Sequence, residues 1–133
     1  MLRAALAAVL IALLGGCGGG AERPQREGAA TRAYQDSERA MERGDFDSAI
    51  ATLEALGDEP EATRRLERYR LEAARRTLAN ARRKLAEAPR AALSQGLVAQ
   101  RYHATPEGRA FVREARRAHA RFRARELDDV DQR

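Results

Sequence analysis

Cys17 carries the only thiol of the 133-residue sequence, and the residues before it have the pattern of a cleavable signal peptide. Arg3 is followed by an unbroken apolar run from Ala4 to Leu14. This run is shorter than the roughly 20 residues that span a bilayer and has the length of a signal-peptide core. Gly15 and Gly16 leave the backbone before Cys17 open to a peptidase. The sequence therefore predicts an exported chain whose signal peptide is removed just before Cys17.

The segment Leu14-Gly15-Gly16-Cys17 resembles the lipobox of bacterial lipoproteins. The resemblance implies that residues 1–16 are a signal peptide and that the three residues before Cys17 are recognised by the signal peptidase. It also implies that Cys17 anchors the mature chain through a covalent lipid, the one non-protein group expected. Because Gly18 rather than Asp follows, it implies anchoring in the outer membrane, facing the periplasm. An ordinary signal peptide with an incidental cysteine and an uncleaved anchor remain as alternatives.

Large apolar residues are scarce in the chain that follows the predicted signal peptide. From Cys17 onward there are 9 Leu, 1 Ile, 3 Val and 3 Phe, a proportion below the roughly 20% at which disorder becomes an alternative. Abundant Ala and helical spacing of the apolar residues instead favour slender helices of modest stability. Glycine and polar residues at 17–30 predict a flexible tether between the lipid and the first helix.

Charge is distributed unevenly along the chain. The net charge is −5 over residues 17–60, +6 over 61–90 and +3 over 91–133. Basic regions can bind anionic lipid, nucleic acid or acidic protein, and a solvated helix face is the plainer interpretation. Export would separate the chain from nucleic acid, so no nucleic-acid partner is expected.

An antiparallel helical hairpin is predicted over residues 31–57. Gly44 can end the first helix in the left-handed conformation, and Asp45 can cap the second by accepting from free backbone N–H groups. The second helix then has an apolar stripe at helical spacing, formed by Phe46, Ala49, Ile50, Leu53 and Leu56.

Gly44, Phe46 and Ala49 resemble the turn of a tetratricopeptide repeat. The resemblance implies a hairpin whose helices touch at Ala49, with Leu53 packed beside it, and a surface of the kind that binds peptides and proteins. Asp36 departs from the pattern, because the family places Leu there. The turn of a second copy would fall near Leu78 and is missing, so the hairpin would be completed by other helices or by a partner. A generic helical hairpin remains the alternative.

The rest of the chain is also predicted to be helical, so an all-α fold is expected. A long helix is predicted at 59–88, capped by Asp58 and stopped by Pro89. Further helices are predicted within 91–127, and residues 128–133 are expected to be a frayed tail.

Two surfaces on the long helix are candidates for binding. Leucines at heptad spacing resemble a coiled-coil seam, which the short hairpin would leave open to a partner helix or to a second copy of the chain. The seam consists of Leu71, Leu78 and Leu85. A candidate basic patch consists of Arg64, Arg65, Arg68, Arg75, Arg76, Arg82, Arg83 and Lys84.

No arrangement of residues typical of catalysis or metal binding is evident. His103 and His119 lie far apart in the sequence without acidic or cysteine residues at ligand spacing, and no glycine-rich phosphate loop is present. We therefore expect no enzyme, no metal and no cofactor beyond the lipid. The expected function is a non-catalytic protein-binding adaptor of the bacterial envelope. The alternative is a binder of anionic envelope polymer or lipid through the arginine-rich long helix.

Overall fold

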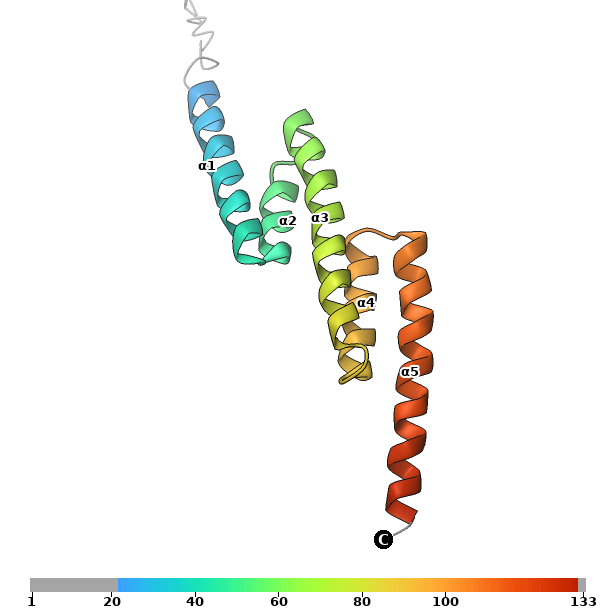
Figure 1. Ribbon diagram of the computed structural model, residues 1–133. Helices are drawn as coiled ribbons and strands as arrows, with labels where there is room; N and C mark the ends of the chain where they lie inside the picture. Colours follow the sequence, from blue (N-terminus) through green and yellow to red (C-terminus); the bar gives the residue numbers. More distant parts are fainter. Residues whose placement is uncertain (1–21, 132–133) are drawn as a thin grey trace, which may run out of the picture.

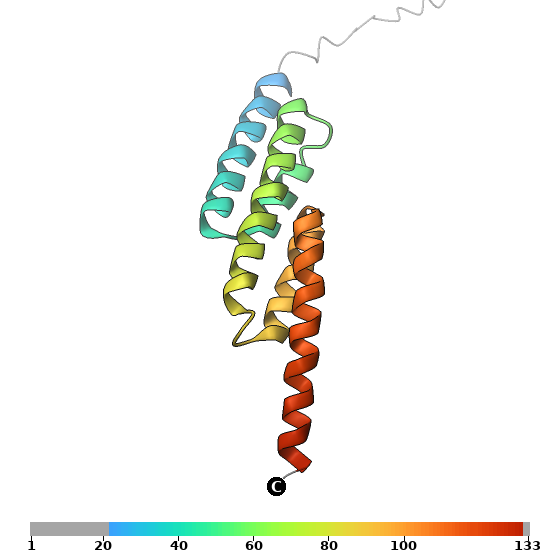
Figure 2. The same ribbon diagram turned by 45° about the vertical axis from the view of Figure 1, so that its right-hand side comes forward.

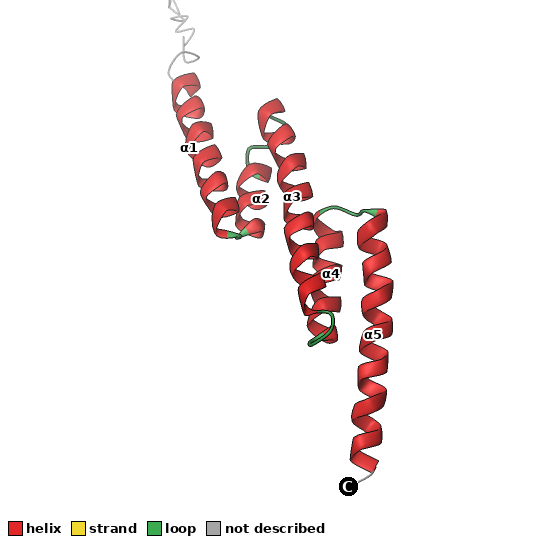
Figure 3. Cartoon of the chain, viewed as in Figure 1, coloured by secondary structure: helices red, strands yellow, loops and turns green. Residues whose placement is uncertain are grey.

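Five helices follow one another through residues 22–131, the part of the chain that the computed structural model describes (Figures 1 and 3). They are α1 (Glu22–Arg43), α2 (Phe46–Glu54), α3 (Pro60–Lys84), α4 (Pro89–Tyr102) and α5 (Pro106–Asp131). Each helix packs mainly against the next one in the chain, so the stack is open rather than wrapped around one centre. The prediction of an all-α fold with a long helix and C-terminal helices is confirmed. Within residues 22–131, no helix has both the length and the apolar character needed to cross a bilayer.

The turn between α1 and α2 follows local signals in the sequence. Gly44 has a φ of 77°, a conformation that side-chain-bearing residues rarely adopt. The Asp45 carboxylate accepts a hydrogen bond from the backbone N–H of Ser48 at 3.3 Å, which satisfies one free donor at the start of α2. The two helices come together at Ala49, which is fully buried, and Leu53 is buried beside it.

Helix α1 begins at Glu22 rather than near residue 31, where the hairpin pattern starts. Residues 22–30 are helical, which corrects the flexible tether predicted over 17–30 for this stretch. Pro24 does not break the helix, because it lies in the first turn, where backbone N–H groups have no acceptor within the helix. The remainder of the predicted tether lies outside the described residues.

The boundaries of α3 differ from those predicted. Pro60 occupies its first turn, and Glu59 stands at the N-cap without a side-chain hydrogen bond, so the cap assigned to Asp58 is wrong. The helix ends at Lys84 rather than near residue 88, and Pro89 begins α4 instead of merely stopping α3. Proline suits the first turn of a helix as well as the position after its end, so the sequence alone does not decide between these roles.

Helix α3 takes part in two separate cores on different faces. The N-terminal core joins α1, α2 and α3 and contains Ala40, Met41, Ala49, Leu53 and Tyr69. The C-terminal core joins α3, α4 and α5 and contains Leu78, Ala81, Ala92, Ala99, Phe111 and Ala115. Figure 2 shows the two groups of helices meeting along α3.

Helix α5 is longer than predicted and continues to Asp131, which corrects the frayed tail predicted over 128–133 for residues 128–131. Residues 132–133 lie outside the described part of the chain. No glycine or proline follows Gly108, so nothing in the sequence stops the helix. Its start is fixed by Thr105, whose hydroxyl accepts a hydrogen bond from the Gly108 N–H at 3.0 Å. The last part of α5 extends past the turn that joins α3 to α4 (Figures 1 and 2).

Candidate functional site

A basic stripe runs along the outer side of α3. Arg64, Arg68, Leu71 and Arg75 stand at i, i+4, i+7 and i+11, which places them on one face of the helix. Two open clefts of about 870 and 430 Å³ lie along this stripe, and both are lined by Arg68 and Leu71. We call these two clefts, together with the stripe that they share, the α3 groove.

The walls of the α3 groove come from distant parts of the chain. The larger cleft is bordered by the end of α4, from Gln100 to Ala104. The smaller one is bordered by Glu38, Met41 and Glu42 of α1. Together the clefts are lined by six arginines and four glutamates, so the groove is positive overall.

Several arginines near the groove are neutralised by acids of the same chain. Glu61 accepts from Arg65 at 2.7 Å and from Arg64 at 2.9 Å. The hydrogen bond from Arg65, followed by the one from Arg64, lowers the pKa of the Glu61 carboxyl below its usual value. Arg76 pairs with Glu72 at 2.7 Å and also donates to the Met41 carbonyl at 3.2 Å. These pairs lie at the surface and therefore position side chains more than they add stability.

Arg68 and Arg75 are two cations of the groove that keep their charge available, and Arg101 at the end of α4 is a third. All three side chains are exposed, and none forms an ion pair with the described side chains. The Arg68 guanidinium lies over the Tyr69 ring at 5.5 Å from its centre, which holds it along the helix by a cation–π contact. With Leu71 between them, Arg68 and Arg75 form a surface that can take one apolar group flanked by two acidic groups.

The predicted basic patch does not form one surface. Arg64, Arg68, Arg75 and Arg76 line the groove, whereas Arg65 turns toward α1 and lies 4.5 Å from the centre of the Tyr34 ring. Beyond the groove, Arg82 pairs with Glu107 of α5 at 2.6 Å, Arg83 donates to the Asn80 side chain at 3.3 Å, and Lys84 ends the helix.

The predicted leucine seam is also divided, and most of it is unavailable to a partner. Leu78 is only 7% exposed and lies in the C-terminal core, with Leu85 packed against that core. Helix α4 folds back after the turn at 85–88 and covers this face, which the pattern of α3 alone could not reveal. Leu71 is half-buried and remains in the groove.

Tyr102 links the two halves of the molecule, a contact that the sequence analysis did not predict. The Tyr102 hydroxyl donates to the Asp47 carboxylate at 2.9 Å, and the Tyr102 ring meets Phe46 edge-on at a centroid distance of 6.0 Å. Burial, and then the hydrogen bond to Asp47, raise the pKa of Tyr102 to about 12. No local pattern marks a contact between residues 55 positions apart.

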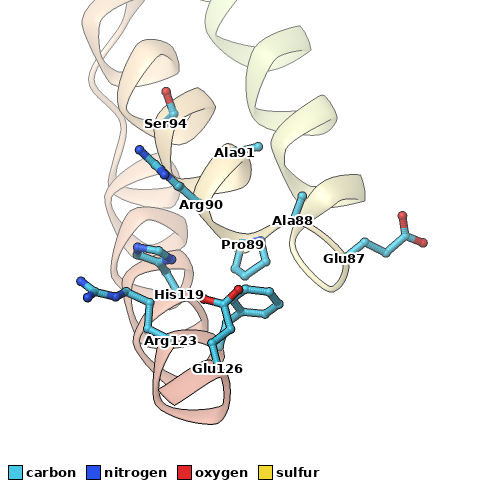
Figure 4. Close-up of a pocket in the computed structure, with 10 residues that line it drawn as sticks. Glu87, Ala88, Pro89, Arg90, Ala91, Ser94, His119, Arg123 and Glu126 are labelled. Carbon is cyan, nitrogen blue, oxygen red and sulfur yellow. The ribbon is translucent and has the colours of Figure 1, made fainter. Parts of the chain in front are cut away.

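A further open cleft of about 840 Å³ lies between the start of α4 and the last part of α5 (Figure 4). Arg90 and Ser94 line it from α4, and His119, Arg123 and Glu126 line it from α5. His119 Nδ1 is buried without a hydrogen-bond partner, whereas His103 is exposed at the end of α4. The cleft has charges of both signs and no residue arrangement that selects a reaction.

Other parts of the chain contribute little to a chemical assignment. The lipobox-like residues Leu14, Gly15, Gly16 and Cys17 lie outside the described residues. In the part that is described, no group of three or more His, Cys, Asp or Glu side chains could hold a metal ion. Comparisons with protein-family models, with curated proteins and with solved structures find no match. The function is therefore inferred from the residues of this chain.

Proposed function

We propose that this chain is a lipid-anchored adaptor of the bacterial cell envelope, which binds another protein in the α3 groove and catalyses no reaction. The observation that carries the proposal is the groove itself, where Leu71 lies between Arg68 and Arg75. The occupant that fits is an extended or helical segment with an apolar side chain between acidic ones. The apolar group would be buried against Leu71, and the acids would meet the two arginines.

The anchoring part of the proposal rests on Leu14-Gly15-Gly16-Cys17. Cys17→Ser should abolish labelling of the protein by a palmitate analogue in cells and release it from the membrane fraction. Unchanged labelling or unchanged fractionation of this variant would contradict lipid attachment at Cys17.

The groove is tested by cross-linking and by direct binding. A photo-reactive amino acid at position 71 should capture the partner in envelope membranes, whereas the same amino acid at exposed position 113 of α5 should not. The captured protein's acidic segment is then bound to the purified chain. Arg68→Glu with Arg75→Glu should weaken binding at least tenfold, because attraction becomes repulsion.

A matched control carries the same change of charge outside the groove. Arg113→Glu with Arg117→Glu on exposed positions of α5 should leave affinity within about twofold. Equal losses in both double variants would mean that net charge, and not the groove, determines binding.

The alternative function is binding of an anionic polymer or lipid through α3. The salt dependence of binding distinguishes it from a protein contact in the groove. Polymer binding depends on many cations acting together and should collapse between low and high salt. A groove contact that buries Leu71 should persist. The observed pairing of Arg64, Arg65, Arg76 and Arg82 with glutamates of this chain favours the groove contact.

A further inference from the structure

The two walls of the α3 groove carry charges of opposite sign. The α1 wall is formed by Glu38, Met41 and Glu42, and the α4 wall by residues 100–104, with Arg101 as its cation and no acid. Glu38, Glu42 and Arg101 are exposed, and none of them forms an ion pair with the described side chains. Helices α1 and α4 lie on opposite sides of α3 (Figures 1 and 2). A segment lying on the stripe would therefore meet acids on one side and a cation on the other.

The charge of each cleft as a whole follows the same division. The larger cleft is lined by four arginines and one glutamate, and the smaller cleft by three of each, with Arg68 common to both. The acid of the larger cleft is Glu67, which belongs to α3. Helix α3 contributes arginines to both clefts, so the difference in charge comes mainly from the α1 wall and the α4 wall.

The spacing of the stripe on α3 fits a helix as the bound segment. Arg64, Arg68, Leu71 and Arg75 recur every three or four residues, which places successive members about 5.5 Å apart along the axis. Side chains on one face of a second helix recur at nearly the same distance. Those on one face of an extended strand recur every 6.8 Å or so, and would be out of step by about 4 Å at the third interval. A helix can therefore stay in contact with the whole stripe.

We propose that the occupant of the α3 groove is a helix with one basic and one acidic flank, and that the opposite charges of the two walls fix its direction along α3. This inference rests on the proposed function, because it concerns the occupant of the same groove. The basic flank would lie beside Glu38 and Glu42, the acidic flank beside Arg101, and an apolar side chain against Leu71.

Direction follows from the geometry of a helix with two unlike flanks. Turning such a helix end to end on the stripe exchanges the flanks, so one direction matches both walls and the other brings like charges together. Because the wall charges are exposed, each ion pair adds little affinity. Repulsion in the wrong direction supplies the selectivity. Added salt should therefore weaken the preference for one direction before it abolishes binding.

Synthetic helical peptides of identical composition test the affinity part of the inference. All carry a leucine with a glutamate one turn before it and one turn after it, to face the stripe. The segregated peptide has lysines on one flank and glutamates on the other, whereas the mixed peptide alternates them on both flanks. The full chain in detergent should bind the segregated peptide roughly fivefold or more tightly than the mixed one. NMR chemical shifts of the isotope-labelled bound peptide should be those of a helix.

Cross-linking tests the direction. A photo-reactive group at the N-terminus of the segregated peptide should attach near one end of the stripe, at residue 64 or at residue 75 but not at both. A second segregated peptide with its flanks exchanged should attach at the other end. The variant with Glu38→Lys, Glu42→Lys and Arg101→Glu reverses the charge of both walls and should reverse the attachment of both peptides.

A control variant with Glu27→Lys, Asp58→Lys and Arg113→Glu makes the same changes at exposed positions outside the groove. It should keep both the affinity and the direction of the unaltered chain. The comparison of peptides uses the unaltered chain, so it stays decisive even if a variant is less stable.

The outcomes separate this inference from the proposed function. Equal binding of the segregated and mixed peptides, abolished by Arg68→Glu with Arg75→Glu, would overturn the role of the walls while the groove stands. If no peptide binds, the inference falls, and photo-capture at position 71 still decides the proposed function. Peptides that bind in extended form would overturn the helical occupant. Self-association of the chain that excludes every peptide would overturn it in favour of a second copy.

Discussion

The two cores that share α3 are built from different side chains. The N-terminal core buries Met41, Leu53 and Tyr69 around two alanines. The C-terminal core has only Leu78 and Phe111 as large buried members, and the rest are alanines. Alanine offers little area for burial but lets helices approach closely. The first core is therefore stabilised by several large side chains, and the second by close contact around one aromatic ring.

Gly96 shows how close that contact is. A Cβ added there would come within 2.9 Å of the Phe111 ring and 3.3 Å of Val112. Phe111 is only 3% exposed, so its ring has little room to move. Gly96 weakens α4 as an isolated helix, but its lack of a side chain is what allows α5 to pack against α4.

Removing the Phe111 ring should have the largest effect on the free energy of unfolding. It should also show whether the two cores unfold separately. Phe111→Ala is expected to cost about 3–5 kcal/mol of unfolding free energy through lost burial and a cavity. Hydrogen exchange should show α4 and α5 losing protection first, because Phe111 belongs to the C-terminal core. Leu53→Ala, expected to cost about 2–5 kcal/mol, should produce the opposite order. Equal loss of protection in all five helices would show that the two cores unfold as one unit.

The difference between the two cores also explains which parts of the fold the sequence could predict. Gly44 and Asp45 act through the backbone next to them, so the first hairpin can be predicted from local signals. Gly96 makes room for the Phe111 ring of the next helix, and nothing near Gly96 in the sequence distinguishes it from a helix breaker. The fold class follows from periodicity, whereas the contacts among α3, α4 and α5 depend on tertiary packing.

The same reasoning applies to the candidate site. The arginine and leucine positions of α3 are correctly placed on a helix by their spacing, but spacing does not say which face another helix covers. Leu78 lies in the core and Leu71 in the groove because α4 folds back along one face only.

Replacing two helical glycines by alanine should change the stability of the chain in opposite directions. Gly96→Ala is expected to cost about 1–2 kcal/mol, because overpacking of about 1–3 kcal/mol exceeds the gain in helix propensity of up to about 1 kcal/mol. At Gly28 in α1, an added Cβ meets nothing within 4 Å. Gly28→Ala should therefore stabilise the chain by about 0.5–1 kcal/mol. Denaturant titration of both variants measures the difference, and effects of the same sign would refute the close contact at Gly96.

The smallest expected effect concerns the link between the two cores, and it has a distinctive pH dependence. Tyr102→Phe removes the 2.9 Å hydrogen bond to Asp47 but keeps the ring against Phe46, so at neutral pH it should cost about 0.5–1.5 kcal/mol.

The pKa of Tyr102 is about 12 in the folded chain and 10.0 in its unperturbed state. A raised pKa means that the folded state holds the proton more tightly. The stability from this group is therefore complete below pH 10 and is lost as pH rises toward about 12.

Denaturant titrations across that pH window compare the unaltered chain with Tyr102→Phe. The unaltered chain should lose stability more steeply, so that the two curves converge as the hydroxyl ionises. A double-mutant cycle with Asp47→Ala supplies the control, because Tyr102→Phe removes no hydrogen bond once the acceptor is gone. In that background the neutral-pH cost of Tyr102→Phe should shrink toward zero. Parallel pH curves, or an equal cost with and without the Asp47 carboxylate, would mean that the hydroxyl does not hold the two halves together.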